Sequence, residues 1–190
     1  MKVIGISASP RQDGNSDELL NRALEGAASA GAEVKKIILN ELKFGPCQEC
    51  GGCDRTGFCV IHDGLEPVYA QLDDADAIVI ASPVFFASVS AQLKMMIDRF
   101  QCRWVAKYIL GKGGRSGRRR KGALLLASGS YKKEFFENSR AVVKAFFATL
   151  DAEYSGELFC GGLEKKGDAA KYKEYPNRAY EIGRELVING

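Results

Sequence analysis

The chain has 190 residues, of which 46% are hydrophobic and 27% are charged, so it has the composition of an ordinary globular protein and the length of one domain spanning residues 1–190. No run of 18 or more apolar residues occurs, and a membrane-spanning helix is not expected. The net charge is +3, but six cations and no acid fall in one expected loop at residues 111–122. Because the basicity is confined to that loop, a nucleic-acid partner is unlikely on charge alone.

Apolar periodicity predicts strands and helices in alternation. The strands are short apolar runs, and the helices carry apolar side chains at three- and four-residue spacing. In chain order, the expected elements are a strand over 2–7, a helix with Asn15 or Ser16 as its N-cap that ends at Gly31, a strand over 34–39, a helix over 66–72, a strand over 77–81, a helix over 91–110, a strand over 123–127, a helix over 134–150, a strand over 154–160 and a helix over 175–187. Five such alternations predict an α/β fold with a parallel, doubly wound sheet.

Three loops follow strands at the carboxyl edge of this sheet, where doubly wound folds bind their ligands. The first, Ser9–Ser16, precedes a helix and favours a phosphate through backbone N–H groups and the helix dipole, although a well-capped helix is the alternative. The second, Ser82–Ser88, holds a proline and two phenylalanines that either form an apolar wall for a ring system or pack into the core. The third, Ser128–Ser130, has small residues that permit close approach of a ligand. No P-loop ending and no G-x-G-x-x-G follow the first strand, which argues against a nucleoside triphosphate or Rossmann dinucleotide site.

A cysteine-rich loop over about residues 40–64 carries the strongest chemical signal. Its four cysteines have the spacing C-x2-C-x2-C-x5-C and are Cys47, Cys50, Cys53 and Cys59. Four thiolates at this density are typical of an iron–sulfur cluster. A zinc site and reduced structural thiols are the alternatives, although the two separated C-x2-C pairs of a zinc ribbon are absent. The first strand begins almost at the N-terminus with no signal-peptide pattern, so we expect a cytoplasmic protein, in which thiols stay reduced.

The ordered combination of these segments resembles the NADPH-dependent FMN reductase family of flavodoxin-like proteins. The segments are Ser9-Pro10-Arg11-x-x-Gly14-Asn15-Ser16, Ser82-Pro83-Val84-Phe85-Phe86 and Ser90-Ala91-Gln92-Leu93-Lys94-x-x-Ile97-Asp98-Arg99. With the four cysteines added, the chain resembles the iron–sulfur flavoprotein branch of that family over most of residues 1–160. The resemblance implies a flavodoxin-like three-layer sandwich, with a five-stranded parallel sheet of order 2-1-3-4-5 and helices on both faces.

The resemblance also implies two cofactors, FMN and a [4Fe-4S] cluster held by the four cysteines. The residues implied to contact FMN are Ser9, Arg11, Asn15 and Ser16 at its phosphate, Pro83, Val84, Phe85 and Phe86 at its ring, and Ser128 and Gly129 on the other side. Two features depart from the family pattern. Phe85 stands where a tyrosine is frequent, and the basic loop is not part of the motif.

We therefore expect an oxidoreductase that passes electrons between a one-electron donor such as ferredoxin, the cluster, FMN and a small acceptor. The alternatives are an NAD(P)H-dependent FMN or quinone reductase without a cluster, and a non-catalytic electron carrier or redox sensor. The resemblance implies a homodimer or homotetramer. The sequence nominates no catalytic acid or base.

Overall fold

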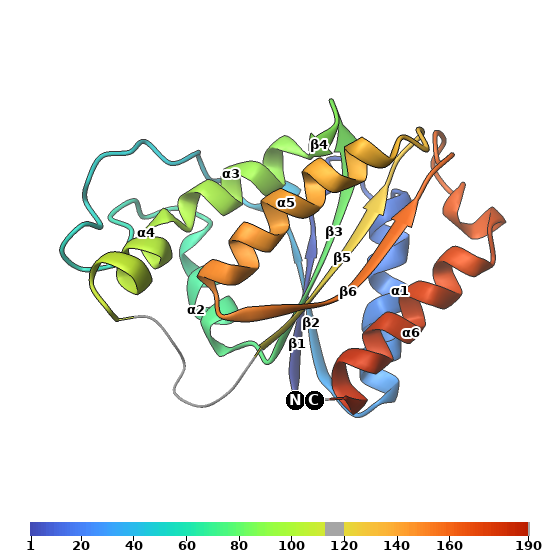
Figure 1. Ribbon diagram of the computed structural model, residues 1–190, viewed down its shortest axis with the longest axis horizontal. Helices are drawn as coiled ribbons and strands as arrows, with labels where there is room; N and C mark the ends of the chain where they lie inside the picture. The colour runs from blue at the N-terminus through green and yellow to red at the C-terminus, as the bar shows by residue number, and fades with distance from the viewer. Residues whose placement is uncertain (113–119, 190) are drawn as a thin grey trace.

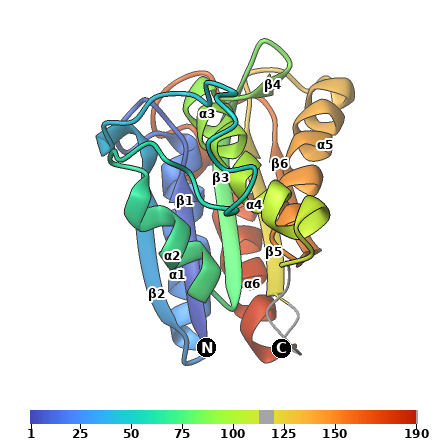
Figure 2. The same cartoon turned by 90° about the vertical axis from the view of Figure 1, so that its left-hand side faces the viewer.

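A computed structural model describes residues 1–112 and 120–189 of the chain (Figures 1 and 2). Strands and helices alternate from the N-terminus. The strands are β1 (Lys2–Ser7), β2 (Glu33–Ile38), β3 (Ala77–Phe85), β4 (Ser88–Val89), β5 (Arg120–Ala127) and β6 (Ala152–Cys160). The helices are α1 (Asn15–Ser29), η1 (Leu39–Glu41), α2 (Glu66–Asp74), α3 (Ala91–Arg99), α4 (Gln101–Trp104), η2 (Val105–Ile109), α5 (Lys133–Thr149), η3 (Ala169–Lys171) and α6 (Glu174–Ile188).

The sheet has the predicted flavodoxin-like topology with one addition. Five parallel strands lie in the order β2-β1-β3-β5-β6, which is the order 2-1-3-4-5 when the long strands are counted. The sheet contains one strand more than the five predicted. The additional strand is the two-residue β4, which pairs antiparallel with the end of β3. The chain reverses there at Phe86 and Ala87, both of which have positive φ values of 47° and 61°, as a type I′ two-residue turn requires. This hairpin projects at the carboxyl edge of the sheet (Figure 1).

Helices cover both faces of the sheet, as predicted, because the central strands are apolar on both sides. One core packs α1 and α6 against the face that carries Val3 and Val79. The other core packs α2, α3 and α5 against the face that carries Ile4 and Ile80. Figure 1 shows the resulting three layers, with α1 and α6 on the right of the sheet. None of the described helices is long and apolar enough to cross a membrane.

Most helix ends lie within two residues of the sequence prediction, and two differences are structurally informative. The first helix has Gly14 as its N-cap, not Asn15 or Ser16, and no side chain caps it. The helix expected over 91–110 is interrupted at Phe100, whose buried ring packs 4.8 Å from that of Tyr69 and 5.2 Å from that of Phe146, measured between centroids. The segment after the break continues as α4 and then as one wide turn, η2, over Val105–Ile109.

The cysteine-rich loop is present where the sequence predicted it, between η1 and α2. It runs beside α3 and α4, on the α2 and α5 side of the sheet (Figure 2). Most of the basic loop predicted at 111–122, namely residues 113–119, lies outside the described residues, and β5 already begins at Arg120.

Candidate functional site

The loops that follow β1 and β3 are fastened to one another at the carboxyl edge of the sheet. The backbone N–H of Ala8 donates to the carbonyl of Ala81 at 2.9 Å, and the Ser90 hydroxyl donates to the carbonyl of Ala8 at 2.6 Å. The same Ser90 oxygen accepts from the backbone N–H of Leu93 at 3.3 Å and so caps α3. Ser90 is fully buried. One serine therefore fixes the first edge loop, the hairpin end and the start of α3.

Nine of the ten residues expected to contact FMN line a single cavity of about 170 Å³ at this edge. They are Ser9, Arg11, Asn15, Ser16, Pro83, Val84, Phe85, Ser128 and Gly129. The tenth, Phe86, does not line it and is fully exposed at the tip of the hairpin. The fold thus brings together residues separated by more than 100 positions in the chain.

The segment before α1 has the features of an anion site. No side chain caps this helix, so its first-turn N–H groups face the cavity without a side-chain acceptor of the kind that usually satisfies them. The Ser9 hydroxyl accepts from the Arg11 N–H at 3.0 Å and donates to the Arg11 carbonyl at 2.9 Å, which holds the turn closed. Arg11 itself is exposed and adds a positive charge at the cavity wall.

The side chain of Asn15 is already engaged in the fold. Its amide donates to the Lys165 carbonyl at 2.9 Å, and its oxygen accepts from the Ala169 N–H at 3.2 Å. Asn15 therefore ties α1 to the loop after β6, and only its backbone N–H and its second amide hydrogen are left for a ligand. The buried Asp17 in the same turn accepts from the Ser7 hydroxyl at 2.7 Å and pairs with Lys36 at 2.6 Å, which offsets its negative charge near the cavity.

Sequence reasoning missed the contribution of the loop after β6. Leu163 and Glu164 also line the cavity, and the Leu163 N–H donates to the Ser128 carbonyl at 2.9 Å. A signal for this was present, because β6 is the sheet neighbour of β5 and its loop must emerge at the same edge.

The four cysteines of the loop line a second cavity, of about 310 Å³. Cys50 is exposed, and Cys47, Cys53 and Cys59 are partly buried. Arg99 and Cys102, which the sequence analysis did not assign to this site, line the cavity too. They lie three residues apart around the end of α3, so helical spacing would have placed them on one side once Arg99 was known to face the loop.

The four cysteines line a cavity but do not converge on one centre where a single ion could bind. Among the described residues, no three His, Cys, Asp or Glu side chains lie close enough together to hold a single metal ion. A zinc ion would need four ligands at 2.0–2.3 Å from one centre. A four-iron cluster has a different requirement, because each thiolate binds a separate iron at a corner of the cluster.

A salt bridge closes the neck of this loop. The Arg99 Nη1 atom lies 2.6 Å from Asp63 Oδ2 and donates to the Gly45 carbonyl at 3.0 Å, and Nη2 donates to the Ile61 carbonyl at 3.3 Å. Asp63 also accepts from the Leu65 N–H at 3.0 Å. The residues that precede Cys47 and those that follow Cys59 are therefore joined through one guanidinium, which is 1% exposed.

The surroundings perturb the titration of these groups. Burial alone would raise the pKa of Asp63, but the Arg99 guanidinium and the Leu65 N–H lower it below its ordinary value. Burial and the nearby Asp54 raise the pKa of the Cys53 thiol, and burial raises that of Cys102 to about 11. A metal would have to displace a proton from Cys53 to bind its sulfur.

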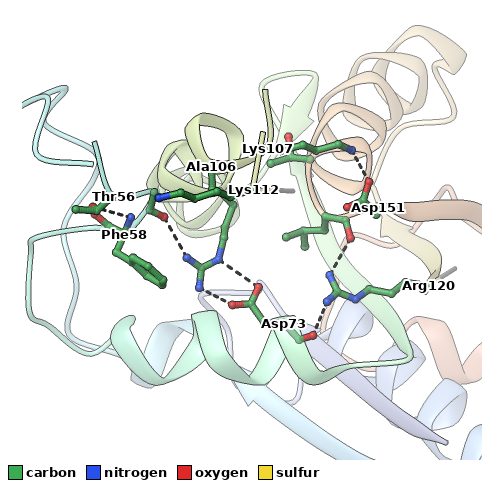
Figure 3. A pocket seen from close by; sticks show the side chains of 12 residues that line it. Thr56, Phe58, Asp73, Ala106, Lys107, Lys112, Arg120 and Asp151 are labelled. Atoms are coloured by element: carbon green, nitrogen blue, oxygen red, sulfur yellow. Dashed lines mark hydrogen bonds and ion pairs between the residues drawn. The ribbon is translucent and has the colours of Figure 1, made fainter. Parts of the chain in front are cut away.

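A third cavity, of about 280 Å³, lies next to the cysteine-rich loop and is drawn in Figure 3. Cations from three elements and the short stretch after η2 line it, together with two carboxylates. The cations are Arg103, Lys107, Lys112 and Arg120, and the carboxylates are Asp73 and Asp151. Lys107 pairs with Asp151 at 2.6 Å, and Arg103 pairs with Asp73. Thr56, Gly57 and Phe58, between Cys53 and Cys59, form one wall.

Comparison with known proteins identifies the family. The family model of NADPH-dependent FMN reductases matches residues 1–158. Together with the flavodoxin-like topology and the edge cavity, this match shows that the chain belongs to the NADPH-dependent FMN reductase family. Within the family it falls in the iron–sulfur flavoprotein branch, as the sequence resemblance predicted, because curated relatives of that description match it.

Two relatives support this placement, and one solved structure shows the same fold. Iron-sulfur flavoprotein MJ0731 of Methanocaldococcus jannaschii is 32% identical over 97% of this chain and 98% of its own length. Iron-sulfur flavoprotein MJ1083 of the same organism is 44% identical over 52% of this chain and 51% of its own length, so that match spans about half of each protein. The NAD(P)H:quinone oxidoreductase from Methanothermobacter marburgensis has the same fold, with a TM-score of 0.76 at 22% identity over 98% of this chain and 96% of the other.

We expect the replacement Asp63→Asn to lower the free energy of unfolding by about 3 kcal/mol, because it leaves the buried Arg99 guanidinium without its counter-charge. Denaturant unfolding at pH 7 measures the change. Glu66→Gln is the matched control, since Glu66 is exposed and its ion pair is with the exposed His62. We expect it to change stability by less than about 0.5 kcal/mol.

The stabilisation by Asp63 should also depend on pH in one direction. Because the pKa of Asp63 is lower in the folded than in the unfolded chain, its contribution is present above about pH 4 and is lost as the pH falls through the folded value. The stability difference between the wild type and Asp63→Asn should therefore shrink in acid. A difference that stays constant down to pH 2 would contradict the assignment.

Proposed function

We propose that this protein is a flavin-dependent oxidoreductase in which Cys47, Cys50, Cys53 and Cys59 hold a [4Fe-4S] cluster and the edge cavity holds FMN. It passes electrons from a ferredoxin-like donor to a small acceptor. When bound, the cluster supplies one-electron transfer and FMN supplies both one- and two-electron chemistry. The observation that carries the proposal is that four thiols line one cavity while nine residues expected to contact FMN line another in the same chain.

The chain's own residues suit the two ends of FMN in different ways. At the phosphate end, the uncapped start of α1 offers N–H groups, and Arg11 offers a charge. At the ring end, Pro83, Val84 and Phe85 offer a mainly apolar wall. Phe85 is about half exposed, so a ring lying on it would cover an apolar surface that now faces water.

The cysteine cavity suits a multi-atom inorganic group. The donor set consists of four soft thiolates, which select iron–sulfur clusters or zinc over hard cations. The loop curves around the cavity, and Glu49 and Gly51 have left-handed backbone conformations with φ values of 49° and 69°. Because Cys50 is exposed, the group would lie near the molecular surface, within reach of a protein donor. We also propose a cytoplasmic location, because thiols stay reduced and available to iron in that compartment.

The flavin cavity is too small to enclose a ligand of this size alone. Its volume of about 170 Å³ lies below the roughly 300–1,000 Å³ that is common for clefts around drug-sized ligands. We therefore assign the remaining cover to a second copy of the chain in a homodimer or homotetramer. The fully exposed Phe86 at the hairpin tip gives that contact an apolar side chain.

The second candidate function is an NAD(P)H-dependent FMN or quinone reductase without a cluster, which the family description and the quinone oxidoreductase fold neighbour favour. A non-catalytic electron carrier or redox sensor is a further alternative. Anaerobic purification followed by iron, sulfide and flavin analysis separates these functions. Iron and FMN together support the proposal, FMN without iron supports the reductase, and a protein with neither refutes both. Sedimentation of the same sample gives the oligomeric state.

The replacement Cys50→Ala is expected to remove the cluster, because one iron loses its thiolate, while FMN affinity stays within about twofold, since Cys50 does not line the flavin cavity. Iron analysis and a flavin titration measure the two effects. Cys160→Ala is the control, because Cys160 is buried in β6 and lies outside the cysteine cavity. Loss of FMN together with iron would mean that the loop supports both sites.

The replacement Arg11→Ala is expected to weaken FMN binding by about tenfold, the effect of losing roughly 1.4 kcal/mol from one charge-assisted contact. Riboflavin, which lacks the phosphate, should bind the wild type and Arg11→Ala equally. Arg22→Ala serves as the control, because Arg22 pairs with Glu25 and lies over the Tyr180 ring of α6, and it does not line the cavity. Unchanged FMN affinity in Arg11→Ala would contradict the placement of the phosphate.

The basic cavity beside the cysteine-rich loop supports an acidic donor protein. Its four cations exceed its two carboxylates, and one wall belongs to the loop itself (Figure 3). Lys112→Glu is expected to slow reduction by a reduced ferredoxin several-fold at low salt, with the difference vanishing as salt screens the charges. Lys35→Glu on β2 has the same charge change far from the cavity and should have little effect. Equal rates for both variants would rule out donor docking at this cavity.

A further inference from the structure

One nitrogen of the Arg99 guanidinium makes no hydrogen bond within the part of the chain that the structure describes. Its two terminal nitrogens make the four hydrogen bonds that close the neck of the cysteine-rich loop, to Asp63 and to the carbonyls of Gly45 and Ile61. The remaining nitrogen, Nε, is buried and has no hydrogen-bond partner among the described residues. The whole side chain is 1% exposed, so bulk water does not satisfy that N–H.

An unsatisfied buried donor costs about 1–3 kcal/mol, and more when the group is charged. Its presence therefore needs an explanation. The position of Arg99 supplies one, because Arg99 lines the cysteine cavity together with the four cysteines. A hydrogen-bond acceptor placed in that cavity would face a wall that includes Arg99 and its unpaired Nε–H. The acceptors that a thiolate-held cluster brings are sulfur atoms.

We propose that the Arg99 Nε–H donates a hydrogen bond to a sulfur of the cluster held by the four cysteines, and that this bond raises the reduction potential of the cluster. The inference rests on the proposed function. Reduction adds one electron from the ferredoxin-like donor and makes the cluster one unit more negative, with no bond broken and no proton required. A hydrogen bond to sulfur stabilises the more negative state more strongly, so it favours reduction.

We attribute the effect on the reduction potential to the hydrogen bond and not to the positive charge of Arg99. The positive charge of Arg99 is balanced by Asp63 at 2.6 Å, and two further acids, Glu49 and Asp54, line the same cavity. The local charge therefore does not favour an extra electron. What Arg99 adds that these groups do not offset is a directed N–H donor on a side chain that is itself shielded from water.

Arg103, four residues later, provides the matched comparison. Its Nε donates to Asp73 Oδ1 at 3.2 Å, Nη1 donates to the Gly57 carbonyl at 3.2 Å, and Nη2 pairs with Asp73. All three of its nitrogens have protein partners. It lines the basic cavity and not the cysteine cavity. The two arginines lie on consecutive helices, α3 and α4, and both pair with an aspartate and contact the loop. They differ in that only the Nε of Arg99 lacks a hydrogen-bond partner among the described residues.

Two replacements separate donor from charge. Arg99→Lys keeps the positive charge beside Asp63 but has no nitrogen at the Nε position. Arg99→Gln loses the charge but places an amide nitrogen at the same distance along the side chain. The anaerobically prepared proteins are first assayed for iron and sulfide, and their cluster potentials are then measured by a redox titration followed by electron paramagnetic resonance. Fe–S bands in resonance Raman spectra are recorded in H2O and D2O.

We expect Arg99→Lys to hold wild-type iron with a reduction potential shifted to a more negative value and a smaller D2O shift of the Fe–S bands. Arg99→Gln should retain more of the D2O shift than Arg99→Lys. Arg103→Lys should leave the potential and the spectra unchanged. A potential that follows charge, with Arg99→Lys equal to the wild type and Arg99→Gln lowered, would overturn the inference.

The other outcomes are equally decisive. If the wild type contains no iron, the proposed function fails first. If the Arg99 variants do not fold or do not load iron, the test uses the wild type alone. Fe–S bands of the wild type that are insensitive to D2O would then contradict the inference. Sensitive bands in the wild type and in Arg103→Lys would support it, because the cluster then accepts an N–H bond in a cavity where Arg99 is the buried side chain with an unused N–H.

Discussion

The salt bridge between Arg99 and Asp63 is the contact on which the second site depends. It joins the two ends of the cysteine-rich loop through four hydrogen bonds of one buried guanidinium. Its position also couples that loop to the flavin edge. Helix α3 begins after Ser90, whose hydroxyl bonds the first edge loop, and it ends at Arg99. A nine-residue helix is about 13 Å long, so a single rigid element sets the separation of the two sites.

The charges of the chain are distributed in keeping with two such sites. Around the cavity at the sheet edge, the buried Asp17 in the first turn of α1 is offset by Lys36, and Arg11 adds a positive charge at the cavity wall. Beside the cysteine-rich loop, four cations outnumber two carboxylates. In the cysteine cavity, Glu49 and Asp54 accompany Arg99. The basic cavity beside the loop therefore carries an excess of positive side chains, whereas the cysteine cavity carries negative ones.

Much of this arrangement follows from the sequence. The order of the five long strands and the position of the cysteine-rich loop could be predicted, because apolar periodicity and turn residues are local signals. The same signals selected nine residues that line one cavity at the sheet edge, although their contact with FMN stays a prediction. Residues whose roles depend on distant partners could not be predicted. Asn15 reads as a cap, but its amide is taken by Lys165 and Ala169 from the far end of the chain. Arg99 reads as part of a helix motif, and nothing local reveals that residues 45 and 61–63 fold back onto it.

The closed neck has a consequence for how the thiol pocket is filled. In many small metal-binding loops the ion itself draws the chain together, so the empty form loses its shape. Here hydrogen bonds within the protein already join Gly45 to Asp63 and Lys43 to Gly64. Much of the entropic cost of closing the loop is therefore met by the fold, whether or not a metal group is bound. We therefore expect the loop to keep its shape if air destroys a bound cluster. A new cluster could then be inserted without refolding of the chain.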